Sequence, residues 1–153
     1  MKSVKIAAVL MTIGIVLLMA STVAAQLKSP DDVKTGLGLL MQVSNDFKRQ
    51  ITAKNFARIP REFKEYTESA DAVRTALKDE PAAFKAKVET RLKAAVAAYQ
   101  KVSDMSSTTP DADKLMAEHA KAVTVMNALF NLFPPELRPD PNAPAGIRGA
   151  PKN

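Results

Sequence analysis

The chain has 153 residues, a formal net charge of +6, one histidine and no cysteine. The lack of cysteine excludes disulfide bonds, thiolate metal sites and thioether-linked haem. The single histidine excludes zinc sites with several imidazole ligands, and di-iron sites that need two Glu-x-x-His motifs. The basic residues are spread along the chain without an arginine-rich tract, which argues against a nucleic-acid partner.

The first 25 residues have the pattern of an export signal. A basic start precedes an uncharged, mostly apolar run of fifteen residues, Ile6 to Ala20, and Val23-Ala24-Ala25 offers the small residues that a signal peptidase needs. As a helix this run would extend about 22 Å, short of the ~30 Å hydrocarbon layer. We therefore predict cleavage after Ala25 and a soluble periplasmic protein without stable membrane insertion. An uncleaved anchor is the alternative, because residues 21–23 could lengthen the run.

The mature chain contains no glycine between Gly38 and Gly146, and its prolines divide it into four segments. Since glycine weakens helices and proline is tolerated mainly in the first helical turn, this pattern predicts four helices. The first is expected over residues 30–53, with Ser29 as its cap, Pro30 in its first position and acidic residues in its first turn. The residues expected to face inward form a seam, a row of mostly apolar residues spaced alternately four and three apart. In the first helix this seam is Val33, Leu37, Leu40, Ser44, Phe47 and Ile51.

Three further seams follow the first. In the second, Pro60 either begins the helix or bends its first turn. The third helix is predicted to open at Glu80-Pro81 and to end before a polar connection, residues 106–109. The fourth is predicted to begin at Thr109-Pro110-Asp111 and to end at Pro134-Pro135. The seams are Phe56, Ile59, Phe63, Tyr66, Ala70, Val73 and Leu77; then Phe84, Val88, Leu92, Ala95, Tyr99 and Val102; then Leu115, His119, Ala122, Met126, Leu129 and Phe133.

Together these segments predict an all-α fold, an up-down-up-down antiparallel four-helix bundle over residues 26–133. Residues 134–153 are rich in proline and poor in apolar residues, so we expect a disordered tail that does not pack. No catalytic motif stands out, and we do not expect an enzyme. The oligomeric state stays open, with a helical dimer among the alternatives.

His119 is the strongest candidate for a chemical role, because it occupies an interior seam position between Leu115 and Ala122. One interpretation is a partly buried histidine that donates to a carbonyl or to Ser44, which interrupts the facing seam. The other is an axial ligand of a haem held between helices. In an antiparallel pairing of the first and fourth helices, Met41 would lie within a turn of His119. A thioether and an imidazole at one level can ligate haem iron without any cysteine.

The stretch from Met41 to Ile51, Met-Gln-Val-Ser-Asn-Asp-Phe-Lys-Arg-Gln-Ile, resembles the first helix of the soluble periplasmic b-type cytochromes. The export signal and four amphipathic segments are also similar to the cytochrome c-prime family. The resemblance implies a haem-ligand role for Met41. It does not supply the other ligand: Phe130 stands where these families place a histidine, and Met126 and Leu129 stand where the c-type members have cysteines.

Two functions follow from these observations. The first is non-covalent haem binding for electron transfer with a redox partner protein, with Met41 and His119 as iron ligands and with Phe47, Phe63 and Tyr66 lining the pocket. The second is a haem-free periplasmic bundle that acts as an interaction or small-ligand scaffold. The resemblance of the first helix favours haem, whereas Phe130 and the lack of cysteine favour the scaffold.

Overall fold

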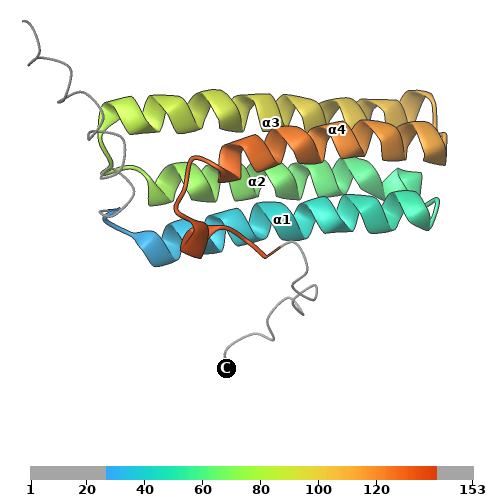
Figure 1. The fold of residues 1–153 in the computed structure, drawn as a ribbon. Coiled ribbons are helices and arrows are strands. Elements are labelled where there is room, and N and C mark those ends of the chain that lie inside the picture. The colour runs from blue at the N-terminus through green and yellow to red at the C-terminus, as the bar shows by residue number, and fades with distance from the viewer. Residues whose placement is uncertain (1–26, 141–153) are drawn as a thin grey trace, which may run out of the picture.

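The computed structural model describes residues 27–140, and within this range the chain is all-helical with four α-helices and no strands. The helices are α1 (Pro30–Thr52), α2 (Ile59–Ala76), α3 (Ala82–Thr108) and α4 (Ala112–Phe130), with short 3₁₀ helices η1 (Phe56–Arg58) and η2 (Pro135–Leu137). Figure 1 shows the four long helices lying side by side along their lengths. The predicted signal peptide lies outside the described residues.

Each helix packs against two neighbours. Helix α1 contacts α2 and α4, and α3 contacts the same two helices. Most residues of the predicted seams are buried and form one core, in which Leu37, Leu92 and Leu129 are fully buried, whereas Phe56, Phe63 and Phe84 are partly buried at its margin. This outcome confirms the helical periodicity read from the sequence, because side chains three and four residues apart share one face of a helix.

Proline and acidic residues set most of the helix starts as expected, with some differences. Pro60 lies in the first turn of α2, which begins at Ile59, so of the two alternatives the helix starts at this proline. At α1, the Ser29 side chain makes no capping hydrogen bond. At α4 the cap is Asp111, whose carboxylate accepts from the Lys114 backbone N–H at 3.0 Å. A carboxylate reaches this amide well, and it also suits the positive end of the helix dipole.

The predicted polar connection at residues 106–109 is wrong for most of its length, because α3 continues to Thr108. Hydroxyl side chains in this turn bond back to helical carbonyls: Ser106 to Ser103 at 2.6 Å and Thr108 to Asp104 at 3.0 Å. Such bonds satisfy the hydroxyl groups inside the helix. The connection to α4 is therefore shorter than the sequence suggested.

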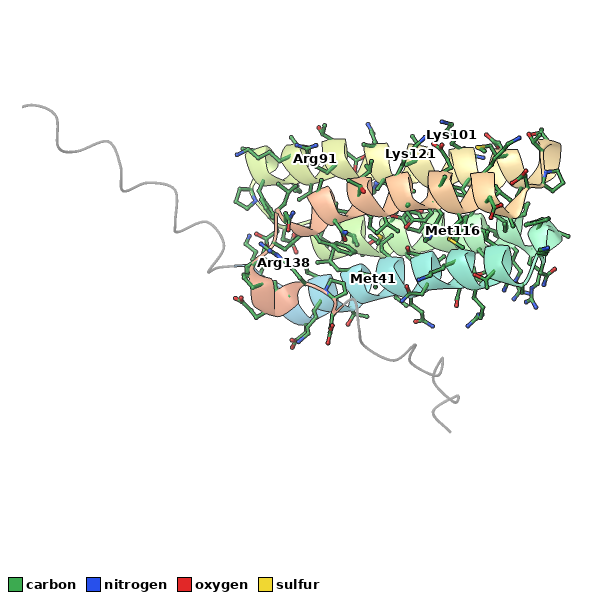
Figure 2. The ribbon with its side chains drawn as sticks, turned by 45° about the vertical axis from the view of Figure 1, so that its right-hand side comes forward. Met41, Arg91, Lys101, Met116, Lys121 and Arg138 are labelled. Carbon is green, nitrogen blue, oxygen red and sulfur yellow. The ribbon has the colours of Figure 1, made fainter. Side chains whose placement is uncertain are left out.

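The expectation that nothing beyond residue 133 packs is also wrong for the start of this segment. Leu137 is buried, and η2 contacts α1. The Arg138 guanidinium donates to the Phe133 carbonyl at 2.8 Å, which satisfies a backbone acceptor just beyond the end of α4. Figure 2 labels Arg138 at this place, beside the start of α1. Phe133 and Leu137 both belong to the buried core, which anchors this turn despite the surrounding prolines. Residues 141–153 of the predicted tail lie outside the described residues.

Candidate functional site

His119 lies in a buried polar cluster where α4 faces α1. Its side chain is 95% removed from solvent, with a residual exposure of 5%. The Nε2 atom lies 2.9 Å from the Ser44 carbonyl oxygen and 3.4 Å from the Ser44 hydroxyl. Since a carbonyl only accepts, Nε2 carries the proton and donates to it. This geometry agrees with the interpretation of His119 as a buried histidine that donates to a carbonyl or to Ser44, and the acceptor is the Ser44 carbonyl.

Tyr99 of α3 extends this cluster into the centre of the molecule. Its hydroxyl donates to the Ser44 hydroxyl at 2.5 Å and lies 3.7 Å from the Met126 sulfur. Ser44 therefore joins α1, α3 and α4 through one backbone carbonyl and one hydroxyl. Tyr99 was predicted only as a core residue. Its signal in the sequence was a hydroxyl in an apolar seam, which needs a polar partner when buried.

Aromatic rings enclose the histidine. The Phe47 ring lies nearly parallel to the imidazole, with centroids 6.4 Å apart and an interplanar angle of 23°. Tyr99 meets the imidazole edge-on at 5.9 Å, and Tyr66 stacks on Tyr99 at 4.1 Å. The Tyr66 hydroxyl is buried and has no hydrogen-bond partner within the described part of the chain. The centre of the molecule is thus filled by rings from all four helices.

Met41, the other predicted haem ligand, lies on α1 one turn before Ser44 and is partly buried against the core (Figure 2). Phe63, predicted to line a haem pocket, is likewise partly buried at the margin of the core. Phe47 and Tyr66, the other two predicted lining residues, are fully buried. The structure thus brings the rings of Phe47 and His119 together. Met41 and Phe63, two further candidates, lie at the edge of the core.

These residues, as packed, do not fit a haem. An axial histidine needs a ring nitrogen that reaches the iron, and the flat haem needs open space in front of that nitrogen. Here Nε2 is used by the Ser44 carbonyl, and Phe47 and Tyr99 lie against the ring. Iron ligation through Nε2 would require that hydrogen bond to break and the aromatic rings to move apart.

Burial also keeps His119 neutral. Desolvation lowers the pKa of its imidazole, the nearby Lys48 ammonium lowers it further, and the hydrogen bond to the Ser44 carbonyl raises it in part. Burial raises the pKa of the Tyr66 hydroxyl and of the Tyr99 hydroxyl well above the usual range. At neutral pH the cluster therefore carries no charge.

We expect this cluster to make the fold acid-sensitive above the range where carboxylates titrate. A histidine whose pKa is lower in the folded state binds its proton preferentially in the unfolded state. Its contribution to stability is therefore complete above the unfolded pKa of about 6.5, and is lost as pH falls from there toward the folded pKa. Uptake of one proton on unfolding changes the free energy of unfolding by at most about 1.4 kcal/mol per pH unit.

Urea unfolding between pH 7.5 and pH 5, followed by circular dichroism, measures this effect. His119 is the only histidine, so a His119→Gln variant should lose most of the slope in this range. A slope that is equal in both proteins would contradict the assignment.

Exposed charges on α2 form a solvated helix face. Arg61 pairs with Glu65 at 3.3 Å and Lys64 with Glu68 at 3.9 Å. Lys101 of α3 and Lys121 of α4, both labelled in Figure 2, pair with Glu118, and these two lysines lower the pKa of the Glu118 carboxyl group. Exposed pairs of this kind contribute little to stability, and we assign no site to them.

Residues 27–140 contain no group of three or more histidine, cysteine, aspartate or glutamate side chains placed to hold a metal ion. None of the helices in this range is both long and apolar enough to cross a bilayer. Comparisons with known proteins found no matching protein family, no matching curated protein and no matching solved structure. The cytochrome resemblance therefore stays a prediction.

Proposed function

We propose that this chain is an exported, haem-free protein that uses an up-down-up-down four-helix bundle as a scaffold for a small ligand or partner. The observation that carries the proposal is the hydrogen bond from His119 Nε2 to the Ser44 carbonyl, inside a closed layer of aromatic rings. The one residue able to supply an imidazole ligand is therefore used to join α4 to α1. Export rests on the signal-peptide pattern of residues 1–25.

The helical arrangement supports the bundle topology. Each helix contacts the preceding and following helices, and α1 also contacts α4, so the four close into a ring around one core. Short connections between long helices are typical of antiparallel neighbours. We expect no enzymatic activity, since His119 and Tyr99 are enclosed and their polar atoms bond to Ser44.

Haem binding for electron transfer is the second candidate. It is supported by the resemblance of the first helix to b-type cytochromes and by the position of Met41, one turn from Ser44 on the helix that faces His119. Binding would require His119 to exchange the Ser44 carbonyl for iron. A redox partner protein would then complete the function.

Titration of the purified protein with haemin, recorded in both redox states, separates the two candidates. We expect haemin to bind no more tightly than it binds to an unrelated helical protein, and to give no sharp low-spin bands. A saturable low-spin spectrum that is lost in both His119→Ala and Met41→Ala would replace the scaffold proposal with the cytochrome function. Met116→Ala is the matched control, because Met116 is also a partly buried methionine and lies one turn before His119 on α4. Circular dichroism must show that each variant still folds.

A further inference from the structure

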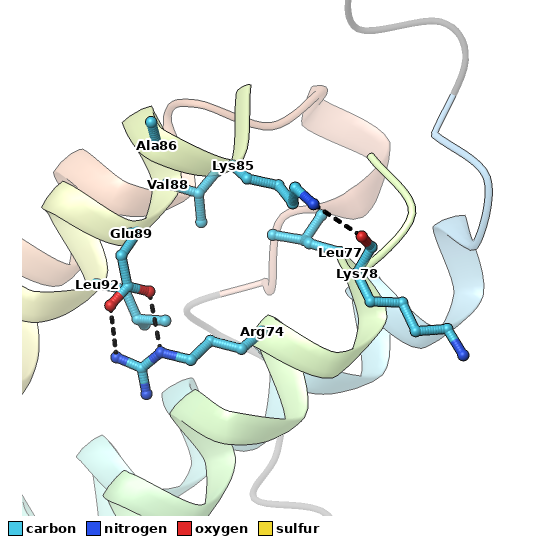
Figure 3. A pocket seen from close by; sticks show the side chains of 8 residues that line it. All are labelled: Arg74, Leu77, Lys78, Lys85, Ala86, Val88, Glu89 and Leu92. Atoms are coloured by element: carbon cyan, nitrogen blue, oxygen red, sulfur yellow. Dashed lines mark hydrogen bonds and ion pairs between the residues drawn. The ribbon is translucent and has the colours of Figure 1, made fainter. Parts of the chain in front are cut away.

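A pocket lies between the end of α2 and the beginning of α3, away from the His119 cluster. Its volume is about 480 Å³, which lies within the usual range of small-molecule sites, about 300–1,000 Å³. Figure 3 shows side chains from the two helices around it. The residues that line it are Arg74, Leu77, Lys78, Lys85, Ala86, Val88, Glu89 and Leu92.

The inner surface of the pocket is formed by apolar side chains that are part of the packed core. Leu77, Val88 and Leu92 are at most 3% exposed, and they belong to the same core as the rest of the molecule. Ala86, by contrast, lines the pocket with a small side chain that is exposed to solvent. A pocket with a fixed apolar floor and a small residue at its mouth suits a short apolar chain.

One wall of the pocket is an ion pair between Arg74 and Glu89, to which Asp71 and Lys93 add further contacts. The Arg74 guanidinium donates to both carboxylate oxygens of Glu89, at 2.9 Å and 3.2 Å, and to Asp71 at 2.7 Å. The bond from Arg74 is the main reason that the pKa of the Glu89 carboxyl lies below its usual value. Both groups therefore stay ionised, and their charges are largely matched. This wall gives the pocket a shape but offers no free cation.

The two lysines at the pocket differ from Arg74. The Lys85 ammonium reaches across to the Lys78 backbone carbonyl at 2.8 Å (Figure 3), which is a neutral acceptor. Neither Lys78 nor Lys85 lies within ion-pair distance of a carboxylate in residues 27–140. Of the three cations and one anion that line the pocket, two positive charges therefore remain unmatched. An ammonium has three donors, so Lys85 retains capacity for an anion.

From this combination we propose that the pocket binds a free amphiphilic carboxylate of the fatty-acid type. Its chain would lie on Leu77, Val88 and Leu92, and its carboxylate would accept from the Lys85 ammonium. The charge of the rim selects an anionic head group, and the floor selects an apolar tail. This inference rests on the proposed function, since it names the ligand class of the small-ligand scaffold.

Dodecanoate, used below its critical micelle concentration, is the probe. We expect saturable binding by calorimetry, with shifts of the methyl resonances of Leu77, Val88 and Leu92 in carbon-13 spectra. Dodecyltrimethylammonium carries the same chain with the opposite charge and should bind at least tenfold more weakly. Equal binding of the two amphiphiles, or shifts spread over the whole core, would overturn the proposal.

Two variants and one control variant test the residues that line the pocket. Lys85→Gln should raise the Kd for dodecanoate about tenfold, whereas Lys87→Gln, which removes an exposed lysine that does not line the pocket, should leave it unchanged. Ala86→Trp should weaken binding at least as much, because its ring would occupy the opening while the core stays intact. Equal effects of the two lysine variants, or unchanged affinity in Ala86→Trp, would contradict the site.

The remaining outcomes separate this inference from the proposed function. Binding to phosphatidylglycerol vesicles without binding of dodecanoate would assign the lysines to a membrane surface and overturn the carboxylate assignment. If neither dodecanoate nor haemin binds, the carboxylate assignment fails while the haem-free scaffold stands. Low-spin haemin binding that depends on His119 would instead overturn the proposed function, whatever happens at Lys85.

Discussion

Replacing Phe47 by alanine is expected to lower the free energy of unfolding by about 3–5 kcal/mol, the usual cost of deleting a buried phenylalanine ring. Phe47 is fully buried, and its ring contacts both Tyr99, with centroids 5.0 Å apart, and His119. Its removal would leave a cavity beside the only histidine, which a closely packed interior fills poorly. Urea unfolding followed by far-ultraviolet circular dichroism measures the change.

Phe63→Ala is the matched control for this substitution. Phe63 is also predicted from its seam to face inward, but it is only partly buried. The same deletion there should cost clearly less, because part of the ring is already in water. Equal losses in the two variants would mean that Phe47 does not hold the centre of the core as described.

Leucine at position 36 is expected to destabilise the protein by about 1–3 kcal/mol, the usual cost of overpacking. A Cβ atom at Gly36 would lie 2.9 Å from the Val73 Cγ2 atom and 3.3 Å from the Val73 Cα and backbone nitrogen atoms. The side chain of Val73 could turn away, but its backbone could not. Helices α1 and α2 would therefore have to separate at this point.

Gly38 offers a control two residues away on the same helix. A Cβ atom there would meet nothing within 4 Å. Gly38→Leu should therefore raise the free energy of unfolding by about 0.5–1 kcal/mol, since glycine costs a helix interior about this much. The same urea experiment compares both variants. Destabilisation by Gly38→Leu as large as that by Gly36→Leu would contradict the close approach of α1 and α2.

The pair of glycines also shows how far the sequence could be interpreted. From the sequence alone, close packing of a neighbouring helix would explain Gly36 and Gly38 equally well. This is correct for Gly36, which touches Val73, and wrong for Gly38, whose Cβ position is open. Nothing local distinguishes two glycines in one helix. The difference depends on which face meets α2, and that is decided by the packing of the whole domain.

The sequence by itself determined the helices and their inward faces, because periodicity and proline chemistry act over a few residues. It also determined that His119 would be internal and would need a partner. Only the tertiary structure decided that the partner is the Ser44 carbonyl and that Tyr99 joins it, since these contacts link residues 75 and 55 positions apart. The pocket at Lys85 had no signal in the sequence either. It depends on a lysine from α3 reaching a carbonyl just beyond α2, and on neither pocket lysine lying within ion-pair distance of a carboxylate in the described chain.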